Sequence, residues 1–344
     1  MAPPLVHSDV SPSVSDLGNL RSEFAELLSG CGVCDLSSRA QLALTGSDRA
    51  RWLNGMVTNN IRDLAVGKGV YSFLLNPQGH ILGDLYAFNR GESITVETDQ
   101  SQLEKLLPIF DRYIIMDDVE VTNLSDRFQS VGIVGAKAAE VLRSAGLQFP
   151  PLEPLQFAEV TWQNLQTTIT RGDLPSVEWY ESWLAPEQVP ALRRALTQSG
   201  AKPVSAAAQE LLRIASGFPR YGQDIRERDL PQETSQDRAL HFSKGCYVGQ
   251  EIVERIRSRG AVHRKFAGFE VGGPLPAPGA RIQAEGKDVG EITSAASLPL
   301  PGGEREVAIG YIRREFAPGK RVQAADTRLT VTNLPFPGIF SPED

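Results

Sequence analysis

The C-terminal quarter of the chain alternates short apolar runs with turn residues, and this pattern restricts the possible folds more than any other feature. Pro and Gly gather in the turns, for example at residues 272–274 and 301–303. The apolar runs recur about every 8–12 residues, which is typical of antiparallel sandwiches and small barrels. The pattern predicts strands at residues 266–271, 281–284, 289–294, 306–312, 321–324 and 327–332. We therefore expect a small antiparallel β-barrel over residues 262–344.

The whole chain is too long for a single core. It has 344 residues, and single hydrophobic cores rarely grow past about 250–300 residues. Between residues 126 and 217, strands and helices follow one another in an order that resembles a ferredoxin-like α+β unit. We expect an α+β protein with a flexible tail at residues 1–18, an N-terminal domain at 19–125, a ferredoxin-like domain at 126–217, a connecting segment at 218–261 and the barrel domain at 262–344.

Composition argues against several classes of protein. The net charge is −7, so no overall basic excess favours direct binding to nucleic acid or to an anionic membrane. No run of about 18 apolar residues occurs, so we expect no membrane span. The N-terminus lacks the basic and apolar regions of a secretory signal. With three cysteines, an odd number, the chain does not suit a disulfide framework. We expect a cytoplasmic protein that is a monomer by default.

Two of the cysteines form a Cys31-x-x-Cys34 pair. Such a pair can be a redox site or half of a zinc site. The other half of a zinc site is missing, because Cys246 is the only remaining cysteine. We therefore expect Cys31 and Cys34 to pack in the core, and we expect no metal site.

Cys246 lies in a different setting. Lys244 precedes it by two residues, and arginines follow at positions 255, 257 and 259. Nearby cations lower the pKa of a thiol and favour the nucleophilic thiolate. Gly245 and Gly249 indicate a loop that bends or lets another segment approach closely. Residues 244–251 therefore contain either a reactive thiol or, as for most free cysteines, a small buried side chain.

The run Lys244-Gly245-Cys246-Tyr247-Val248-Gly249-Gln250-Glu251 resembles the signature of the YgfZ family. These are folate-binding proteins of iron–sulfur cluster assembly and repair, paralogous to the aminomethyltransferase (T-protein) of the glycine cleavage system. Further similar blocks lie at residues 35–37, 44–48, 53–59, 213–224, 231–233, 290–294, 308–311 and 334–336. The resemblance implies a three-domain ring with folate in the central hole. An N-terminal α/β folate-binding region, a ferredoxin-like middle domain and the barrel would form this ring.

The same resemblance implies a function and a site. Tetrahydrofolate or a folate derivative would be the cofactor, and iron–sulfur enzymes, including tRNA-modifying ones, or assembly factors would be partners. Cys246 and Lys244 would be catalytic at the mouth of the folate pocket. The thiolate would carry a mixed disulfide, a persulfide or a transient metal contact. The residues shaping this loop would be Gly245, Tyr247, Gly249, Gln250, Glu251 and Arg255.

Candidate folate-binding residues follow from the resemblance as well. They are Met56, Tyr71, Asp84, Glu181 and Arg213. Glu181 would bind the pterin ring, whose 2-amino and N3 groups offer two donors side by side. Arg213 would face the glutamate tail of folate. The alternatives are a surface glutamate on a strand and an arginine in a structural ion pair.

The chain departs from the aminomethyltransferases at one position. Those enzymes have Gly-Gly-x-x-Asp-Asp after the Asn-x-x-Gly loop, and the first Asp is tied to the transfer chemistry. Here that position is Gly83, and Asp84 should lie on the other face of the strand. We therefore do not expect true aminomethyl transfer. The alternatives left open are a different folate-dependent aminomethyl or methyl transferase, and an adaptor that binds a partner through the basic residues of 255–265.

Overall fold

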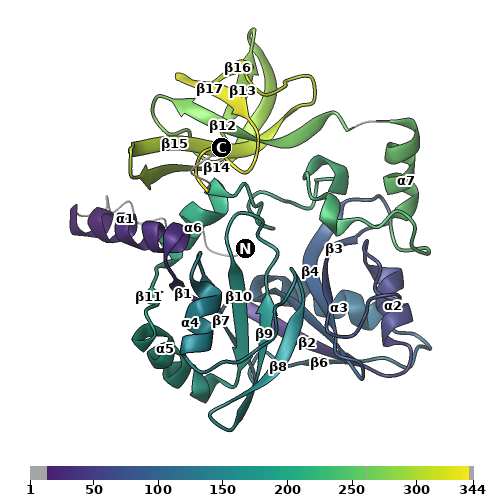
Figure 1. Ribbon diagram of the computed structural model, residues 1–344. Helices are drawn as coiled ribbons and strands as arrows, with labels where there is room; N and C mark the ends of the chain where they lie inside the picture. The colour runs from purple at the N-terminus through teal and green to yellow at the C-terminus, as the bar shows by residue number, and fades with distance from the viewer. Residues whose placement is uncertain (1–13, 261, 341–344) are drawn as a thin grey trace.

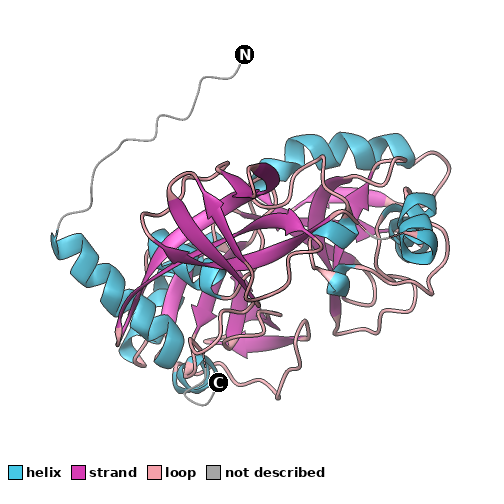
Figure 2. Ribbon diagram, turned by 90° about the horizontal axis from the view of Figure 1, so that it is seen from above, coloured by secondary structure: helices cyan, strands magenta, loops and turns pink. Residues whose placement is uncertain are grey.

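The computed structural model describes residues 14–260 and 262–340. Within them, two β-sheets lie below a closed β-barrel, and the segment from residue 218 to 260 runs between these parts (Figure 1). A view from above shows strands in the interior and most helices at the periphery (Figure 2). This arrangement confirms the expected three-domain α+β fold.

The N-terminal sheet has the strand order β3-β4-β5-β2-β6. Its strands are β2 (Arg39–Thr45), β3 (Gly69–Leu75), β4 (Ile81–Asn89), β5 (Ile94–Asp99) and β6 (Glu120–Asn123). Helices α2 (Arg49–Met56) and α3 (Leu103–Tyr113) pack on one face through buried residues such as Leu53, Leu85 and Leu106. On the opposite face, Phe73 and Leu75 of β3 pack against Ile225 and Val253 of the segment 218–260.

The middle sheet has the order β11-β1-β7-β10-β9-β8. Its elements are β1 (Gly32–Asp35), β7 (Gln129–Val134), α4 (Ala138–Ser144), β8 (Phe157–Trp162), β9 (Leu165–Arg171), β10 (Trp179–Leu184), α5 (Val189–Gln198) and β11 (Lys202–Pro203). Strand β1 comes from the start of the chain but pairs with β7 and β11. Cys31 precedes this strand and Cys34 lies within it; both are buried free thiols, and burial raises the pKa of both. Both cysteines therefore pack in the interior.

The barrel closes in the order β12-β15-β14-β13-β16-β17. Its strands are β12 (Arg264–Gly272), β13 (Arg281–Ala284), β14 (Lys287–Leu300), β15 (Gly303–Arg313), β16 (Arg321–Ala324) and β17 (Thr327–Thr332). β14 and β15 are longer than expected and reach helix α1 (Val14–Ser29), where Arg21 Nη1 donates to the carbonyl of Leu300 at 3.0 Å. Helices α1 and α6 (Ala206–Ala215) share one buried cluster with these strands.

The expected tail at residues 1–18 needs a correction. Residues 1–13 lie outside the described part of the chain, but residues 14–18 form the first turns of α1. Phe24 and Leu27 of this helix are fully buried in the cluster shared with α6 and the barrel. Residues 14–18 therefore belong to a helix that is anchored by tertiary packing, and not to a flexible tail.

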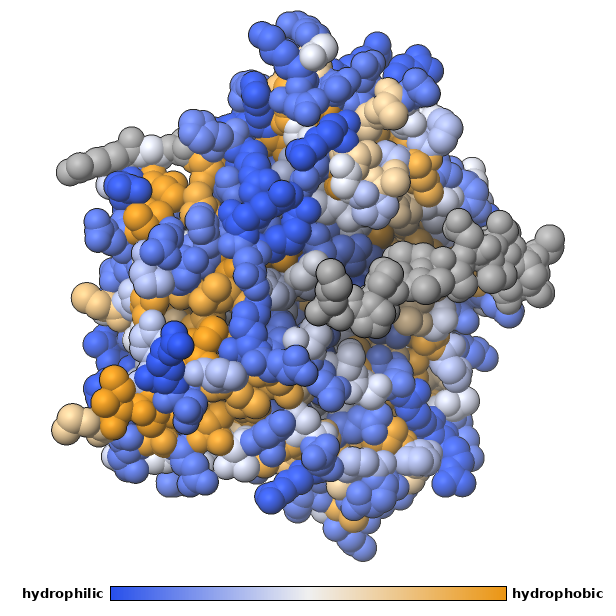
Figure 3. All heavy atoms as spheres, turned by 180° about the vertical axis from the view of Figure 1, so that it is seen from behind, coloured by the Kyte–Doolittle hydropathy of each residue, from blue (hydrophilic) through white to orange (hydrophobic). Residues whose placement is uncertain are grey.

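The surface is mixed in character. Seen from behind, polar side chains cover most of the area and apolar side chains gather in separate patches (Figure 3). Ile115 and Met116, which follow α3, are the most exposed large apolar residues in the described part of the chain. Among the described helices, none has the length and apolar character that crossing a bilayer requires.

Candidate active site

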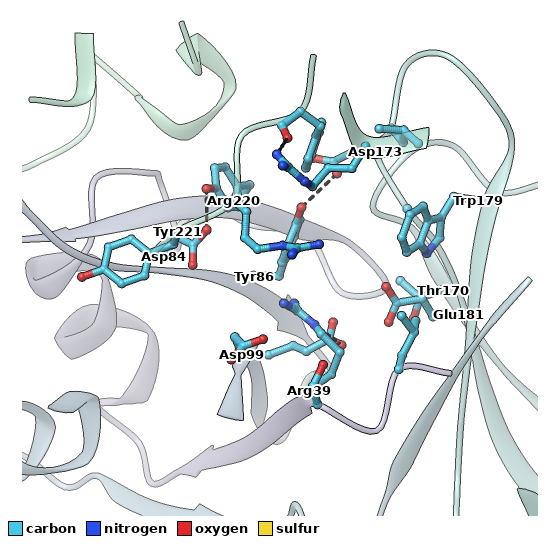
Figure 4. Close-up of a pocket in the computed structure, with 18 of the residues that line it drawn as sticks. Arg39, Asp84, Tyr86, Asp99, Thr170, Asp173, Trp179, Glu181, Arg220 and Tyr221 are labelled. Carbon is cyan, nitrogen blue, oxygen red and sulfur yellow. Dashed lines mark hydrogen bonds and ion pairs between the residues drawn. The ribbon is translucent and has the colours of Figure 1, made fainter. Parts of the chain in front are cut away.

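A pocket of about 440 Å³ lies between the N-terminal and middle sheets. Strands β2 to β5 supply one side, β9 and β10 supply another, and residues 218–221 complete it. Figure 4 shows Arg39 and Asp99 on one side of this space, with Thr170, Trp179 and Glu181 across from them. Four of the predicted folate-binding residues line the same pocket, namely Tyr71, Asp84, Glu181 and Arg213.

The alternation of side chains along β4 decides which residues face this pocket. Asp84 and Tyr86 line it, whereas Leu85 points into the core beneath α3. Gly83 shares the core-facing side: a Cβ on it would lie 2.8 Å from Gln102 Oε1 and 3.0 Å from a methyl of Leu106. The expectation that glycine at position 83 deprives the site of its carboxylate is therefore wrong. The glycine at position 83 removes no carboxylate from the pocket, and Asp84 places one there.

Asp84 is held by two donors. The Tyr71 hydroxyl donates to Oδ2 at 2.7 Å, and Gln102 Nε2 donates to Oδ1 at 2.7 Å. Burial, together with the Asp84 carboxylate, raises the pKa of Tyr71 well above its ordinary value, so its hydroxyl stays protonated. These bonds fix the carboxylate at the pocket wall.

A second cluster joins the two sheets. Arg39 Nε of β2 donates to Glu97 Oε1 of β5 at 3.2 Å, and Glu97 also faces Glu181 of β10. Burial first, and then the Glu97 carboxylate, raise the pKa of Glu181 to about 8. For Arg39, burial acts to lower the pKa, but the carboxylates of Glu97 and Glu181 outweigh it, so the net pKa is raised. The cluster therefore contains a permanent cation and a carboxyl group that is largely protonated at neutral pH.

Two buried polar atoms lie beside Glu181 on the pocket wall. Thr170 Oγ1 and Trp179 Nε1 are buried and make no hydrogen bond within the described residues, and both side chains line the pocket. A buried polar group left unpaired costs about 1–3 kcal/mol. Such groups on a pocket wall are available to a ligand or to water.

Arg213 differs from the expectation, because its guanidinium is fully used by the protein. Its five donor hydrogens meet both carboxylate oxygens of Glu210, Asp224 Oδ2, the carbonyl of Phe218 and Ser294 Oγ, at 2.5–3.0 Å. This saturates the donors of an arginine. Arg213 therefore joins α6, the 218–224 turn and strand β14, which matches the structural alternative.

Arg238 forms a wall that the sequence did not indicate. It pairs with Asp173, and its guanidinium carbon lies 4.0 Å from the ring centroid of Tyr71 and 4.5 Å from that of Phe218. A second cavity of about 560 Å³ lies beyond it, toward the barrel. Asp173 and Phe218 line both spaces, so this group of side chains separates them.

Met56 does not reach the pocket. It is buried at the end of α2, in the core that Leu53 and Trp52 form beneath the N-terminal sheet. Its expected role in binding folate therefore finds no support in its position.

Residues 244–249, here called the cysteine loop, lie apart from the pocket. Cys246 is exposed, but the residues that line the pocket end at Tyr221. The Val248 amide instead donates to the Gly55 carbonyl at 3.2 Å, beside α2. Figure 1 shows the helix that follows, α7 (Gln250–Arg259), at the outer edge of the molecule. The expected place of Cys246 at the mouth of the pocket is therefore wrong.

Lys244 also has contacts other than those expected. It is buried, and its Nζ donates to the carbonyls of Asn54, Val57 and Asn59 at 2.5, 2.6 and 2.7 Å. Burial lowers the pKa of Lys244 to about 7. Because three N–H groups are all a lysine has, its ammonium fastens the cysteine loop to the segment after α2.

The other residues of the motif 244–251 also help to attach the cysteine loop to the N-terminal domain. Gly249 has a φ of +83°, and a Cβ on it would lie 2.6 Å from the Asn76 carbonyl. Tyr247 is half-buried in the cluster around Phe73 and Val253. Gln250 begins α7, Glu251 and Arg255 are exposed on it, and Gly245 has open space around it. The loop is thus held tightly while the thiol at its centre faces solvent.

Comparisons with known proteins agree with this architecture. The family model described as the GCVT N-terminal domain matches residues 16–244, more than half of the chain. The chain belongs to the GCVT family. The model of the CAF17 C-terminal β-barrel domain matches residues 263–336. This pairing confirms the resemblance to the YgfZ family and places the protein among aminomethyltransferase-like members of the GCVT family.

Several relatives span most of the chain. An aminomethyltransferase of Rubrobacter xylanophilus is 26% identical over 322 residues, covering 92% of this chain and 86% of that protein. A putative chloroplastic transferase of Arabidopsis thaliana is 24% identical, covering 84% of this chain and 66% of the other. The glycine cleavage system aminomethyltransferase T of Bartonella henselae has the same fold, with a TM-score of 0.83 at 24% identity over 93% of this chain and 90% of that one.

Several pocket residues were hard to recognise in the sequence. Arg39 and Glu97 occupy strands whose alternate positions are apolar, and a charged residue in such a strand indicates a buried polar cluster. That signal was available. Trp179 lies two residues before Glu181 on β10, so the alternation of the strand alone places both side chains on one face. Thr170 is an ordinary strand residue, and only the pairing of β10 with β9 brings it beside Glu181.

Proposed function

We propose that the protein binds tetrahydrofolate, or a close folate derivative, in the pocket between the two sheets. The observation that carries this is Glu181, a carboxyl group on the pocket wall with Thr170 Oγ1 and Trp179 Nε1 unpaired beside it. A carboxylate suits the adjacent N3 and 2-amino donors of a pterin. The aromatic side chains of Tyr86 and Phe88 supply apolar surface for a flat ring.

The glutamate tail of folate needs a different cation from the one expected. Because the donors of Arg213 are all used, the tail would lie toward Arg220, which lines the pocket and whose side chain is about half exposed. Arg220 pairs with Glu210 at 2.8 Å, an exposed contact that a ligand carboxylate can replace.

We further propose that folate binding supports the assembly or repair of iron–sulfur enzymes, including tRNA-modifying ones. The support is the CAF17-type barrel and the resemblance of residues 244–251 to the YgfZ signature. In this proposal Cys246 is the reactive group, and its exposure lets a partner protein reach it. The pocket and the thiol are then two separate sites of one protein.

A second candidate function is one-carbon transfer, and the position of Asp84 favours it. Bound tetrahydrofolate supplies the nitrogens N5 and N10, which carry one-carbon units. Asp84 is a carboxylate on the pocket wall, held by Tyr71 and Gln102. A group held in this way can accept or return a proton at a fixed point.

Three single variants separate these functions. Tetrahydrofolate binding is measured for Glu181→Ala, Cys246→Ala and Asp84→Asn, and each is tested for restoring an iron–sulfur enzyme in cells lacking the protein. We expect Glu181→Ala to lose both properties and Cys246→Ala to lose only restoration. If Cys246→Ala restores the enzyme fully, the thiol mechanism is wrong. If Asp84→Asn alone abolishes restoration while folate still binds, one-carbon transfer is the better account.

A further inference from the structure

The guanidinium of Arg39 is only partly used by the protein. Its Nε donates to Glu97 Oε1 at 3.2 Å, but within residues 14–260 and 262–340 neither Nη atom has a hydrogen-bond acceptor. The side chain is 22% exposed, and its guanidinium carbon lies 5.6 Å from the ring centroid of Tyr86. An arginine held this way keeps up to four N–H donors for something that enters the pocket.

Glu181 faces the same space from the other sheet. Each of the two side chains alters the pKa of the other, and Figure 4 shows both at the pocket, with Thr170 and Trp179 beside Glu181. The pocket therefore presents an acceptor on one strand and a fork of donors on another. The saturated donors of Arg213 show that free donors are not a general property of arginines in this pocket.

This arrangement matches one kind of heterocycle edge. A carboxylate accepts from an amino group and a neighbouring ring N–H, while a guanidinium donates to a carbonyl oxygen next to that N–H. A 2-amino-4-oxopyrimidine ring carries these groups in this order. In a 2,4-diamino ring the oxygen is replaced by an amino group, which would direct donors against the donors of Arg39.

We propose that Arg39 determines ligand specificity by donating its free guanidinium N–H groups to the 4-oxo oxygen of a 2-amino-4-oxo ring. Glu181 holds the donor edge of the same ring, and the pocket therefore rejects 2,4-diamino analogues. This inference rests on the proposed folate function. A site built to hydrogen-bond one group discriminates strongly against an analogue that leaves its polar atoms unpaired. We expect a preference of about 100-fold for the 4-oxo ring.

The test compares tetrahydrofolate with its 4-amino-4-deoxy analogue by titration calorimetry on the full chain. The wild type should bind the 4-oxo compound about 100-fold more tightly. The double variant Arg39→Gln/Glu97→Gln replaces the ion pair by a neutral amide pair, and the preference should fall below about fivefold. The matched control is Arg305→Gln/Glu270→Gln, an Arg–Glu pair of the barrel at 2.6 Å, which should keep the wild-type preference.

Two results would overturn the inference. One is equal affinity of the wild type for both compounds, and the other is an unchanged preference in the folded double variant. If the double variant fails to fold, Arg39→Met replaces it, because a methionine side chain is long and unbranched but has no N–H donor; an unchanged preference there has the same meaning. If tetrahydrofolate does not bind the wild type at about 1 mM, the proposed function itself fails.

Discussion

In the pocket, Thr170 Oγ1 and Trp179 Nε1 have no partner among the described residues, and Arg39 keeps donors that none of those residues binds. In the cysteine loop, by contrast, all three N–H groups of Lys244 are bound to carbonyls. Sequence reasoning assigned Lys244 to chemistry and did not single out Thr170, Trp179 or Arg39. The polar groups of the three pocket residues remain available to a ligand. The N–H groups of Lys244 are consumed by the protein itself.

The difference teaches what a polar motif can mean. Lys244 and Gly249 hold the loop against the segment after α2 and the β3–β4 turn, and only the Cys246 thiol is left outside. A loop held rigidly in this way fixes the position of the thiol at the surface, although none of the holding residues contacts the thiol. The polar groups of the pocket are not used to hold the fold in this way. Because they are unpaired, they favour a ligand whose donors and acceptors complement them.

The largest effect should come from Lys244→Met, which tests whether the lysine is a fastening group. The change leaves three buried carbonyls without a donor, so the free energy of unfolding should fall by about 3–4 kcal/mol. Urea unfolding followed by circular dichroism measures this. Arg255→Met, on the exposed face of α7, should change the stability by less than about 0.5 kcal/mol.

An opposite outcome would break the comparison. If Lys244→Met keeps wild-type stability but slows alkylation of Cys246 severalfold, the lysine acts on the thiol and not on the fold.

The next largest effect should come from Glu181→Gln, which tests whether the pocket is the ligand site. The amide keeps the shape of the side chain but replaces an acceptor by a donor, so tetrahydrofolate should bind about 100-fold more weakly. Fluorescence quenching of the pocket tryptophan Trp179 reports the affinity. Cys246→Ser should bind as the wild type does, and equal losses in both variants would mean that the two regions are one site.

Much of the fold was accessible from the sequence because local patterns agree with it. The Pro/Gly turns of the last quarter predict the barrel, and Asn76-Pro77-Gln78-Gly79 predicts the hairpin turn, where Gly79 has a φ of +79°. Helix α1 packs through Phe24 and Leu27, and the tail expected at residues 1–18 missed its first turn, which begins at Val14.

The site was less accessible, and the reason is physical. Asp84 and Gly83 were correctly placed on opposite faces of a strand, but nothing local says which face is the pocket; α3 decides that by covering one. Arg213 was recognised as an important arginine, yet its partners Asp224 and Ser294 come from distant segments, and only the fold shows that they saturate it.

A smaller effect should follow from Gly249→Ala, with Gly245→Ala as its matched control. Gly249 has a positive φ, and a methyl group on it would press on the Asn76 carbonyl, so we expect a loss of about 2 kcal/mol. Gly245 has open space around it, so its variant should stay within about 0.5 kcal/mol of the wild type. Equal stabilities would show that the loop is not clamped, which would weaken the contrast with the pocket.

The pH dependence of binding is the finest test, because it addresses the pocket alone. Burial and the Glu97 carboxylate raise the pKa of Glu181 to about 8, and a pterin edge with two donors requires the ionised carboxylate. Tetrahydrofolate affinity should therefore be constant above pH 8 and fall by up to about tenfold per unit as the pH drops below 8. Calorimetry in buffers of different ionisation enthalpy would detect the proton released on binding at pH 7.

Glu97→Gln sharpens this test by removing one cause of the shift. With the Glu97 charge gone, Glu181 keeps the attraction of Arg39 and its burial but loses the repulsion, so its pKa should fall and the affinity should decline only at lower pH. Removal of the Cys246 thiol by Cys246→Ser should leave the profile where it is in the wild type. A profile that moves with Cys246 but not with Glu97 would mean that the titrating group lies in the cysteine loop, and the division between the two regions would be lost.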